Sequence, residues 1–339
     1  MDTWTPSQRR LHRFAVFTAC CTFLLVIAGG LVTSTGSGLS VPDWPLSYGK
    51  LMPPMVGGIL YEHGHRMVAT FVGMLMIVLA YWLWKAEERR WVRILGLAGL
   101  AAVIVQGVLG GLTVLFLLPT PISVMHATLA QSFFGLTVII ALVTSPGWKR
   151  VVPREMPVAD KTRRLALSVS GILLVQLILG AWMRHSDAGL AIPDFPLSYG
   201  QMLPPATDAG ISAVNQDRLA GGLPPVELSQ VWINFAHRLG ALLTAIVVLS
   251  FVLHVLKAYQ DEKRLREPAI VLGLLLVMQI LFGALTVWTG KGVEIATVHV
   301  AVGSLLLATS ACITLRTFRL FTLSQTEPEV STLAQLSRS

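Results

Sequence analysis

Four histidines stand at repeated places in the sequence and carry most of the chemistry that this chain could perform. His65 and His126 lie in the first half, and His237 and His299 lie in the second half. Each lies near the start of a long apolar segment, where an ionisable side chain is costly and usually functional. Two histidines on facing helices of a four-helix bundle commonly hold a heme iron. The pattern therefore predicts two heme pockets, one in each half.

Two arginines directly follow two of these histidines. Arg66 follows His65, and Arg238 follows His237. We expect both guanidinium groups at the outer membrane interface, where heme propionates would emerge and where guanidinium and helix N–H groups suit a carboxylate. The alternative is that both are ordinary interfacial residues whose side chains extend to lipid headgroups.

The two halves differ at one position close to a histidine. Glu62 precedes His65 by three residues, one helical turn away on the same face, and its equivalent in the second half is Asn234. A carboxylate near a metal can accept a proton or stabilise a developing cation, whereas a neutral amide suits a heme held for electron transfer. The alternative is that Glu62 caps the helix or pairs with Arg66.

The other four histidines lack this fourfold placement. His63 competes with His65 as a ligand, but its equivalent in the second half is Phe235, so we predict a supporting or solvent-facing role for it. We expect structural or surface roles for His12, His185 and His254.

A stretch of sequence that occurs in both halves is expected to lie above the predicted pockets. Residues 38–54 and 189–205 share 11 of 17 positions, which indicates an internal duplication. Prolines and glycines exclude a helix here and predict tight turns. We expect Asp43 and Asp194 to form turns by side-chain hydrogen bonds, in preference to a catalytic role. The aromatic residues expected to pack these loops onto the helices or against a porphyrin edge are Trp44, Tyr48, Phe195 and Tyr199.

Composition predicts the elements that position these residues. The chain is 54% hydrophobic and 13% charged, against about a quarter charged in soluble domains. Eight apolar stretches are each long enough to cross a bilayer as a helix. The sequence thus predicts an all-α integral membrane protein. Its expected spans are residues 14–33, 64–84, 94–116, 123–144, 165–184, 231–256, 269–289 and 296–315.

The basic residues predict an orientation for these spans. The net charge is +8, but with eight spans 20 of the 26 Lys and Arg residues fall on the side of the two termini. This positive-inside bias indicates cytoplasmic termini and outward-facing repeated loops, and it argues for a lipid membrane and against nucleic acid as the partner. The three cysteines lie inside predicted spans, where we expect them to pack as small apolar residues.

The duplication divides the chain into two halves of four spans. We predict an N-terminal half at 1–150, a cytoplasmic linker at 151–164, a C-terminal half at 165–320 and a polar, disordered tail at 321–339. Since four spans return the chain to its starting side, the two tandem four-helix bundles share one orientation and are related by a pseudo-two-fold axis along the membrane normal. The extra residues 206–230 are expected to form a surface cover or partner loop.

This combination of motifs resembles the heme A synthase family. The shared features are the eight duplicated spans, the sequence TGSGLSVPDWP, the ExxHR motif at 62–66 and the three further placed histidines. The resemblance covers nearly the whole chain. It implies an inner-membrane oxidoreductase that oxidises the C8 methyl group of heme O to the formyl group of heme A, for use by terminal oxidases, with heme b as cofactor.

The resemblance also assigns roles to residues. Glu62, His65 and His126 match the catalytic, substrate-side set, and His237 and His299 match the heme b ligands. Many relatives carry cysteine pairs in the outer loops. Here the corresponding residues are Ser40, Ser47, Ala191 and Ser198, which places the chain with the Cys-less, bacterial-type branch.

Membership would imply partners and a location. Heme O would be delivered by a heme O synthase, an unidentified acceptor would take the electrons, and a homo-oligomer is compatible with the sequence. The location would be the bacterial inner membrane, with multiple spans. Two other classes stay open from the residues alone. One is a di-heme b-type electron-transfer protein or quinol-linked cytochrome anchor, and the other, less favoured, is a transporter.

Overall fold

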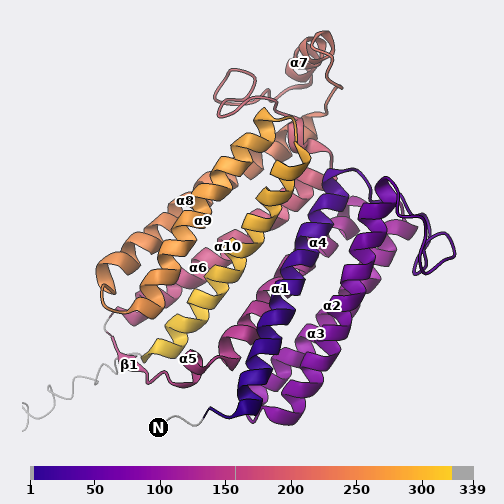
Figure 1. The fold of residues 1–339 in the computed structure, drawn as a ribbon. Helices are drawn as coiled ribbons and strands as arrows, with labels where there is room; N and C mark the ends of the chain where they lie inside the picture. Colours follow the sequence, from indigo (N-terminus) through magenta and orange to yellow (C-terminus); the bar gives the residue numbers. More distant parts are fainter. Residues whose placement is uncertain (1–3, 157, 323–339) are drawn as a thin grey trace, which may run out of the picture.

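The computed structural model describes residues 4–156 and 158–322 and confirms the all-helical prediction (Figure 1). Eight of its helices are long and apolar enough to cross a membrane, so the protein is a multi-pass membrane protein. All eight begin three to eight residues before the predicted spans, and α3 and α9 end one residue before the predicted ends. They are α1 (Pro6–Ser34), α2 (Gly58–Ala86), α3 (Arg90–Leu115), α4 (Thr120–Thr144), α6 (Ala159–His185), α8 (Leu228–Ala258), α9 (Lys263–Trp288) and α10 (Val293–Leu320).

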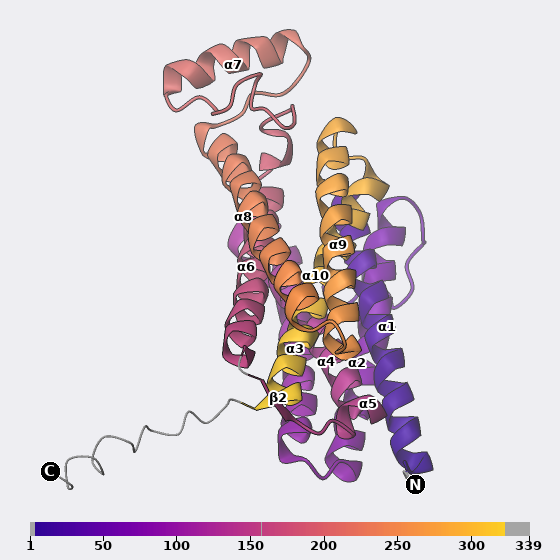
Figure 2. The same cartoon turned by 90° about the vertical axis from the view of Figure 1, so that its left-hand side faces the viewer.

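The eight helices form two bundles that lie side by side (Figures 1 and 2). Helices α1 to α4 contact one another in a ring, and so do α6, α8, α9 and α10. The bundles meet along α1 and α4 on one side and α6 and α10 on the other. Corresponding helices of the two halves therefore take corresponding places, as the duplication predicts.

Each bundle has its own apolar core, and its outer surface is apolar as well. Met76, Leu79 and Leu83 of α2 are fully buried in the first core, and Phe251 and Leu272 are fully buried in the second. Many other large apolar side chains are exposed, as expected of helices that face lipid tails.

The shorter elements lie at the ends of the bundles. Between α4 and α6 are α5 (Pro146–Lys149) and β1 (Arg154–Glu155), and β1 pairs in parallel with β2 (Phe321–Thr322) beyond α10. The predicted 151–164 linker is thus partly structured, and α6 already begins within it. The predicted tail lies outside the described residues from 323 onward.

The 206–230 insertion contains a helix that the sequence pattern did not predict. Helix α7 (Asp208–Ala220) follows a short 3-10 helix η1 (Ala188–Leu190) and lies above the second bundle (Figure 2). The Thr207 side chain caps its start by accepting from the Gly210 N–H. The buried Arg218 donates to the carbonyls of Leu190 and Ala191, which ties α7 to the start of the second repeated loop.

Candidate functional site: two histidine pairs beneath repeated loops

The four placed histidines lie in the first third of α2, α4, α8 and α10. They therefore occupy similar depths near the end of the bundles that carries the repeated loops. His126 lies close enough to His65 to act on it electrostatically, and His299 acts on His237 in the same way. The structure thus pairs the histidines within each half.

Each histidine ring packs against a glycine of the preceding helix in its own half. A Cβ added to these glycines would lie within 3.0 to 3.2 Å of the ring Cε1 atom, tighter than ordinary carbon–carbon contact. A side chain at any of these positions would crowd the histidine ring. The four pairs are Gly29 with His65, Gly110 with His126, Gly180 with His237, and Gly283 with His299.

The ring nitrogens fit the ligand set of a heme iron. The Nδ1 atoms of His65, His126 and His299 are buried and have no hydrogen-bond partner in the described part of the chain. Buried polar atoms without partners are costly and need an explanation. A heme iron would satisfy such nitrogens, and the two histidines of each half would hold it.

Glu62 lies at the junction of α2 and the first repeated loop. Its Oε1 is 2.6 Å from Nη2 of Arg66, and its Oε2 accepts the N–H of Val41 at 2.8 Å. The carboxylate is buried, with 5% of its side chain exposed. The pairing with Arg66 that the sequence left as an alternative is therefore present, and it fixes the carboxylate one turn from His65.

Both arginines bind loop carbonyls. Nη1 of Arg66 donates to the carbonyls of Asp43 and Leu46 at 2.7 and 2.8 Å. Arg238 donates to the carbonyls of Leu197 and Ile192 at 2.8 and 3.0 Å. Each arginine thus holds its repeated loop on the helix that carries the histidine.

Asn234 occupies the place of Glu62 in the second half. Its Nδ2 donates to the carbonyl of Ala188 at 2.8 Å, and its Oδ1 is buried without a hydrogen-bond partner among the residues that the structure describes. Glu62 accepts from a loop N–H, whereas Asn234 donates to a loop carbonyl. The two residues share the task of anchoring the loop and differ in charge.

The repeated loops fold by the same hydrogen bonds in both halves. Asp43 accepts the N–H groups of Tyr48 and Gly49 at 2.6 and 2.7 Å, and Asp194 accepts those of Tyr199 and Gly200 at 2.7 and 2.8 Å. The predicted turn-forming role is confirmed. The hydrogen bonds from Gly49 and Tyr48 lower the pKa of Asp43 below its ordinary value.

Each loop tip is a tight hairpin. Tyr48 and Gly49 both have positive φ, 53° and 67°, between the paired residues Ser47 and Lys50. Two successive residues with positive φ are typical of a type I′ turn, which favours glycine. The repeated Ser-Tyr-Gly sequence therefore specifies the shape of the tip.

Trp44 and Phe195 pack these loops onto the bundles, as predicted, whereas Tyr48 is half exposed and its hydroxyl donates to the Ser40 carbonyl of its own loop. A Cβ added to Gly111 of α3 would lie only 2.7 Å from the Trp44 ring, so the ring fills the space that a side chain would need. In the second half, Phe195 meets Trp288 of α9 with ring centroids 6.1 Å apart. Both loops thus pack against the third membrane-spanning helix of their own half, α3 or α9.

His63 supports the first loop. Its Nδ1 is 2.8 Å from the Ser47 hydroxyl, and the residue is buried, so the solvent-facing alternative is wrong. His12 and His254 have structural roles, because they bond to the Ala141 carbonyl and the Thr162 hydroxyl. The carbonyl of His185 accepts the Thr120 hydroxyl across the two bundles.

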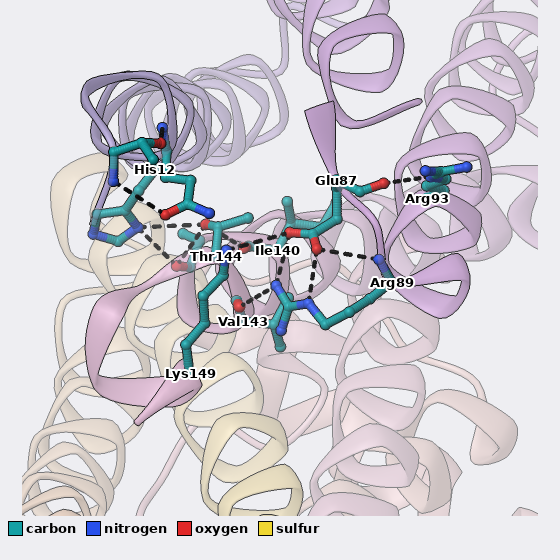
Figure 3. Close-up of polar contacts among 11 residues, drawn as sticks. His12, Glu87, Arg89, Arg93, Ile140, Val143, Thr144 and Lys149 are labelled. Atoms are coloured by element: carbon teal, nitrogen blue, oxygen red, sulfur yellow. Dashed lines mark hydrogen bonds and ion pairs between the residues drawn. The ribbon is translucent and has the colours of Figure 1, made fainter. Parts of the chain in front are cut away.

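A separate polar cluster lies at the opposite end of the first bundle (Figure 3). Arg89 holds the carboxylate of Glu87 with two bonds of 2.8 Å and donates to the Val143 carbonyl. A cavity of about 250 Å³ beside it is lined by Glu87, Thr144 and Lys149. Because Glu87 is fully bonded, this cluster ties α2 and α3 to the end of α4 and is distinct from the histidine pairs.

Comparison with known proteins agrees with this geometry. The chain matches the COX15-CtaA family model, described as cytochrome oxidase assembly protein, over residues 12–58 and 56–311. The chain belongs to this family. Both histidine pairs and both repeated loops lie within the matched residues.

Several curated relatives of this family match along nearly their full length, and each is named heme A synthase. The protein of Alkalihalophilus pseudofirmus is 28% identical over 91% of this chain and 97% of its own. That of Lysinibacillus sphaericus is 26% identical over 88% and 92%, and that of Halalkalibacterium halodurans is 28% identical over 89% and 95%.

Sequence reasoning identified the histidines but missed what supports them. The glycine pairs Gly29-Gly30 and Gly110-Gly111 indicate close helix approach or room for a flat ligand, but the sequence does not connect them with the histidine rings. The repeated spacing could have revealed Gly180 and Gly283, because both halves place a glycine at the corresponding position of the preceding helix.

Proposed function

We propose that this protein is a heme A synthase that oxidises the C8 methyl group of heme O to a formyl group. Family membership and the names of the full-length relatives support the activity. The observation that carries the proposal is the pair of matched histidine sites that differ in one neighbour. Glu62 is a buried carboxylate at the first site, and Asn234 is a neutral amide at the second.

The two halves then divide the work. His65 and His126 hold the substrate heme O in the first half, and His237 and His299 hold a heme b cofactor in the second half. A bound heme b supplies one-electron redox chemistry. The two histidine pairs lie at similar depth, one in each bundle. The interface between the bundles, formed by α1 and α4 with α6 and α10, lies between them.

Glu62 is the residue that suits the oxidation step. The Arg66 ion pair and the Val41 N–H fix its two oxygens, so the carboxylate keeps one position beside the pocket. From there it can accept a proton from the reacting methyl group or stabilise positive charge that develops on the substrate. Asn234 offers neither property.

The repeated loops exclude water from the two pockets. Arg66 and Arg238 hold the loops by their carbonyls, and they present cationic groups at the outer ends of the pockets, where heme propionates would emerge. Closing such a site strengthens the electrostatic interactions within it.

The location and partners follow from the same assignment. The termini and basic loops are cytoplasmic, in a bacterial inner membrane, and the repeated loops face outward. A heme O synthase supplies the substrate, and a separate acceptor takes the electrons. The protein belongs to the Cys-less branch, since Ser40, Ser47, Ala191 and Ser198 occupy the outer-loop places and Cys20, Cys21 and Cys312 lie in helices.

Substitution of Glu62 tests this function. Glu62→Gln preserves the size of the side chain and the acceptor for Val41 but removes the charge. We expect the purified variant to bind heme and to accumulate heme O or an early oxidation product, measured by heme extraction and mass spectrometry. The matched control Asn234→Ala changes the equivalent site and should still yield heme A. Normal heme A production by Glu62→Gln would refute the role of the carboxylate.

A further inference from the structure

Three of the four histidines have a glutamine beside them, and the fourth has a leucine. Gln106, Gln176 and Gln279 each precede a histidine-backing glycine by four residues, one helical turn. The equivalent position on α1, four residues before Gly29, is Leu25. The two halves thus differ at a second place besides Glu62 and Asn234.

The glutamines contact the histidines directly. Nε2 of Gln106 donates to the His126 carbonyl at 2.9 Å and lies 3.5 Å from ring Nε2. Nε2 of Gln176 donates to the His237 carbonyl at 2.9 Å and lies 3.1 Å from ring Nδ1.

Gln279 contacts its histidine through the ring. Its Nε2 lies 3.4 Å from ring Nε2 of His299. His65 differs from the other three, since neither of its ring nitrogens makes a hydrogen bond within residues 4–156 and 158–322, and its Nδ1 is buried.

The glutamines also carry free acceptors. Oε1 of Gln106, Gln176 and Gln279 is buried without a partner in the described residues. A histidine that binds iron through one ring nitrogen carries a proton on the other, and an acceptor for that proton fixes the ring and strengthens the ligand. Rotation of the Gln279 carboxamide about its last bond exchanges Nε2 and Oε1, so its Oε1 can accept the proton of the His299 ring. Gln106 and Gln176 fix their histidines through the bond to the backbone carbonyl.

The leucine comes with a compensating change on the facing helix. A Cβ on Gly240 of α8 would lie 2.2 Å from Oε1 of Gln176, so Gly240 makes the space that the carboxamide fills. The equivalent of Gly240 in the first half is Val68, three residues after His65. Leu25 and Val68 both pack against the apolar core of the first bundle. In the first half, the apolar pair Leu25 and Val68 therefore takes the place that Gln176 and Gly240 have in the second half.

We propose that Gln106, Gln176 and Gln279 are positioning residues that fix three of the heme-ligating histidines, and that Leu25 and Val68 leave His65 as the ligand that releases. This inference rests on the proposed function, in which His65 faces the substrate. A cofactor pocket gains from two fixed ligands. A substrate pocket must release its product in every turnover, and one ligand without a hydrogen bond lowers the barrier to that release.

Installing the missing pair tests the proposal. We would compare Leu25→Gln/Val68→Gly with the control Val68→Gly, each loaded with heme O, and follow heme transfer to excess apomyoglobin. One hydrogen bond is worth about 0.5–1.5 kcal/mol, so the double variant should release heme O about 2- to 12-fold more slowly than the control. Equal release rates in the two variants would overturn the proposal.

A second variant covers the case in which the double variant does not fold. Gln176→Leu installs the residue found at the equivalent place on α1 and removes both the donor to the His237 carbonyl and the polar contact with the ring. It should speed transfer of the heme in the second pocket about 2- to 12-fold and shift the electron paramagnetic resonance signal of its low-spin ferric heme. Unchanged rate and signal would contradict the positioning role.

These outcomes are separable from failure of the proposed function. If wild-type protein converts heme O but the release rates do not change, only the positioning proposal fails. If wild-type protein holds heme b alone in both pockets, the synthase assignment fails, whatever the order of the release rates.

Discussion

Gly180 gives the sharpest test of the glycine-backed histidine. A Cβ at this position would lie 3.0 Å from Cε1 of His237. This contact is tighter than ordinary carbon–carbon packing, so in Gly180→Ala the ring or the helix must move by a few tenths of an ångström. A metal site tolerates shifts of only about 0.2 Å in its ligand distances. The added methyl group should therefore remove His237 from ligation.

The expected size of the effect follows from overpacking. Extra methyl groups in a packed site cost about 1–3 kcal/mol, which corresponds to roughly 5- to 150-fold in an equilibrium constant. Heme b in purified Gly180→Ala, measured by pyridine hemochrome spectra and mass, should fall accordingly, while heme in the first pocket is retained.

A glycine on the same helix provides the matched control. A Cβ on Gly171 of α6 would meet nothing within 4 Å. Gly171→Ala should bind heme b normally and be slightly more stable, because alanine favours a helix by about 0.5–1 kcal/mol over glycine. A Gly180→Ala protein with full heme b and an unchanged spectrum would refute the reasoning.

Two further predictions concern the parts that hold the site. Gly111→Ala places a Cβ 2.7 Å from the Trp44 ring and should loosen the first loop, seen as faster tryptic cleavage at Lys50, whereas Gly107→Ala, with nothing within 4 Å, should not. Glu87→Gln should lower the thermal unfolding midpoint (Figure 3). Burial raises the pKa of Glu87, but the hydrogen bonds and charge of Arg89 outweigh it, so the folded pKa lies below the ordinary 4.5. The charged Glu87 side chain stabilises the fold above pH 4.5, and this stabilisation is lost as the pH falls through the lowered pKa. The thermal unfolding midpoint of Glu87→Gln should therefore fall less on acidification than that of the wild type.

The sequence predicts the fold well because its signals are strong and local. Apolar length identifies the eight helices, and duplication places them in two bundles. Helix α7 was missed because its residues are polar and lie between glycine and proline clusters, and its docking depends on Arg218 contacting the distant carbonyls of Leu190 and Ala191. Sequence periodicity does not contain such a contact.

The sequence predicts the histidine ligands of the site but not the residues that hold these histidines and the loops in place. Ionisable residues in apolar segments stand out, and the duplication picks the four histidines out by their equivalent positions. The contact of Gln176 with His237 and the space left by Gly240 depend on how two helices pack. The function of the two arginines also needed the structure, because their donors meet backbone carbonyls that no side-chain pattern reveals.

The division of labour between the halves is the central claim, and heme analysis of two variants tests it most directly. Heme would be extracted from purified His65→Ala and His299→Ala and identified by mass. The account predicts that His65→Ala keeps heme b and loses heme O and heme A, whereas His299→Ala loses heme b. Loss of heme b from His65→Ala, with heme b retained in His299→Ala, would contradict it.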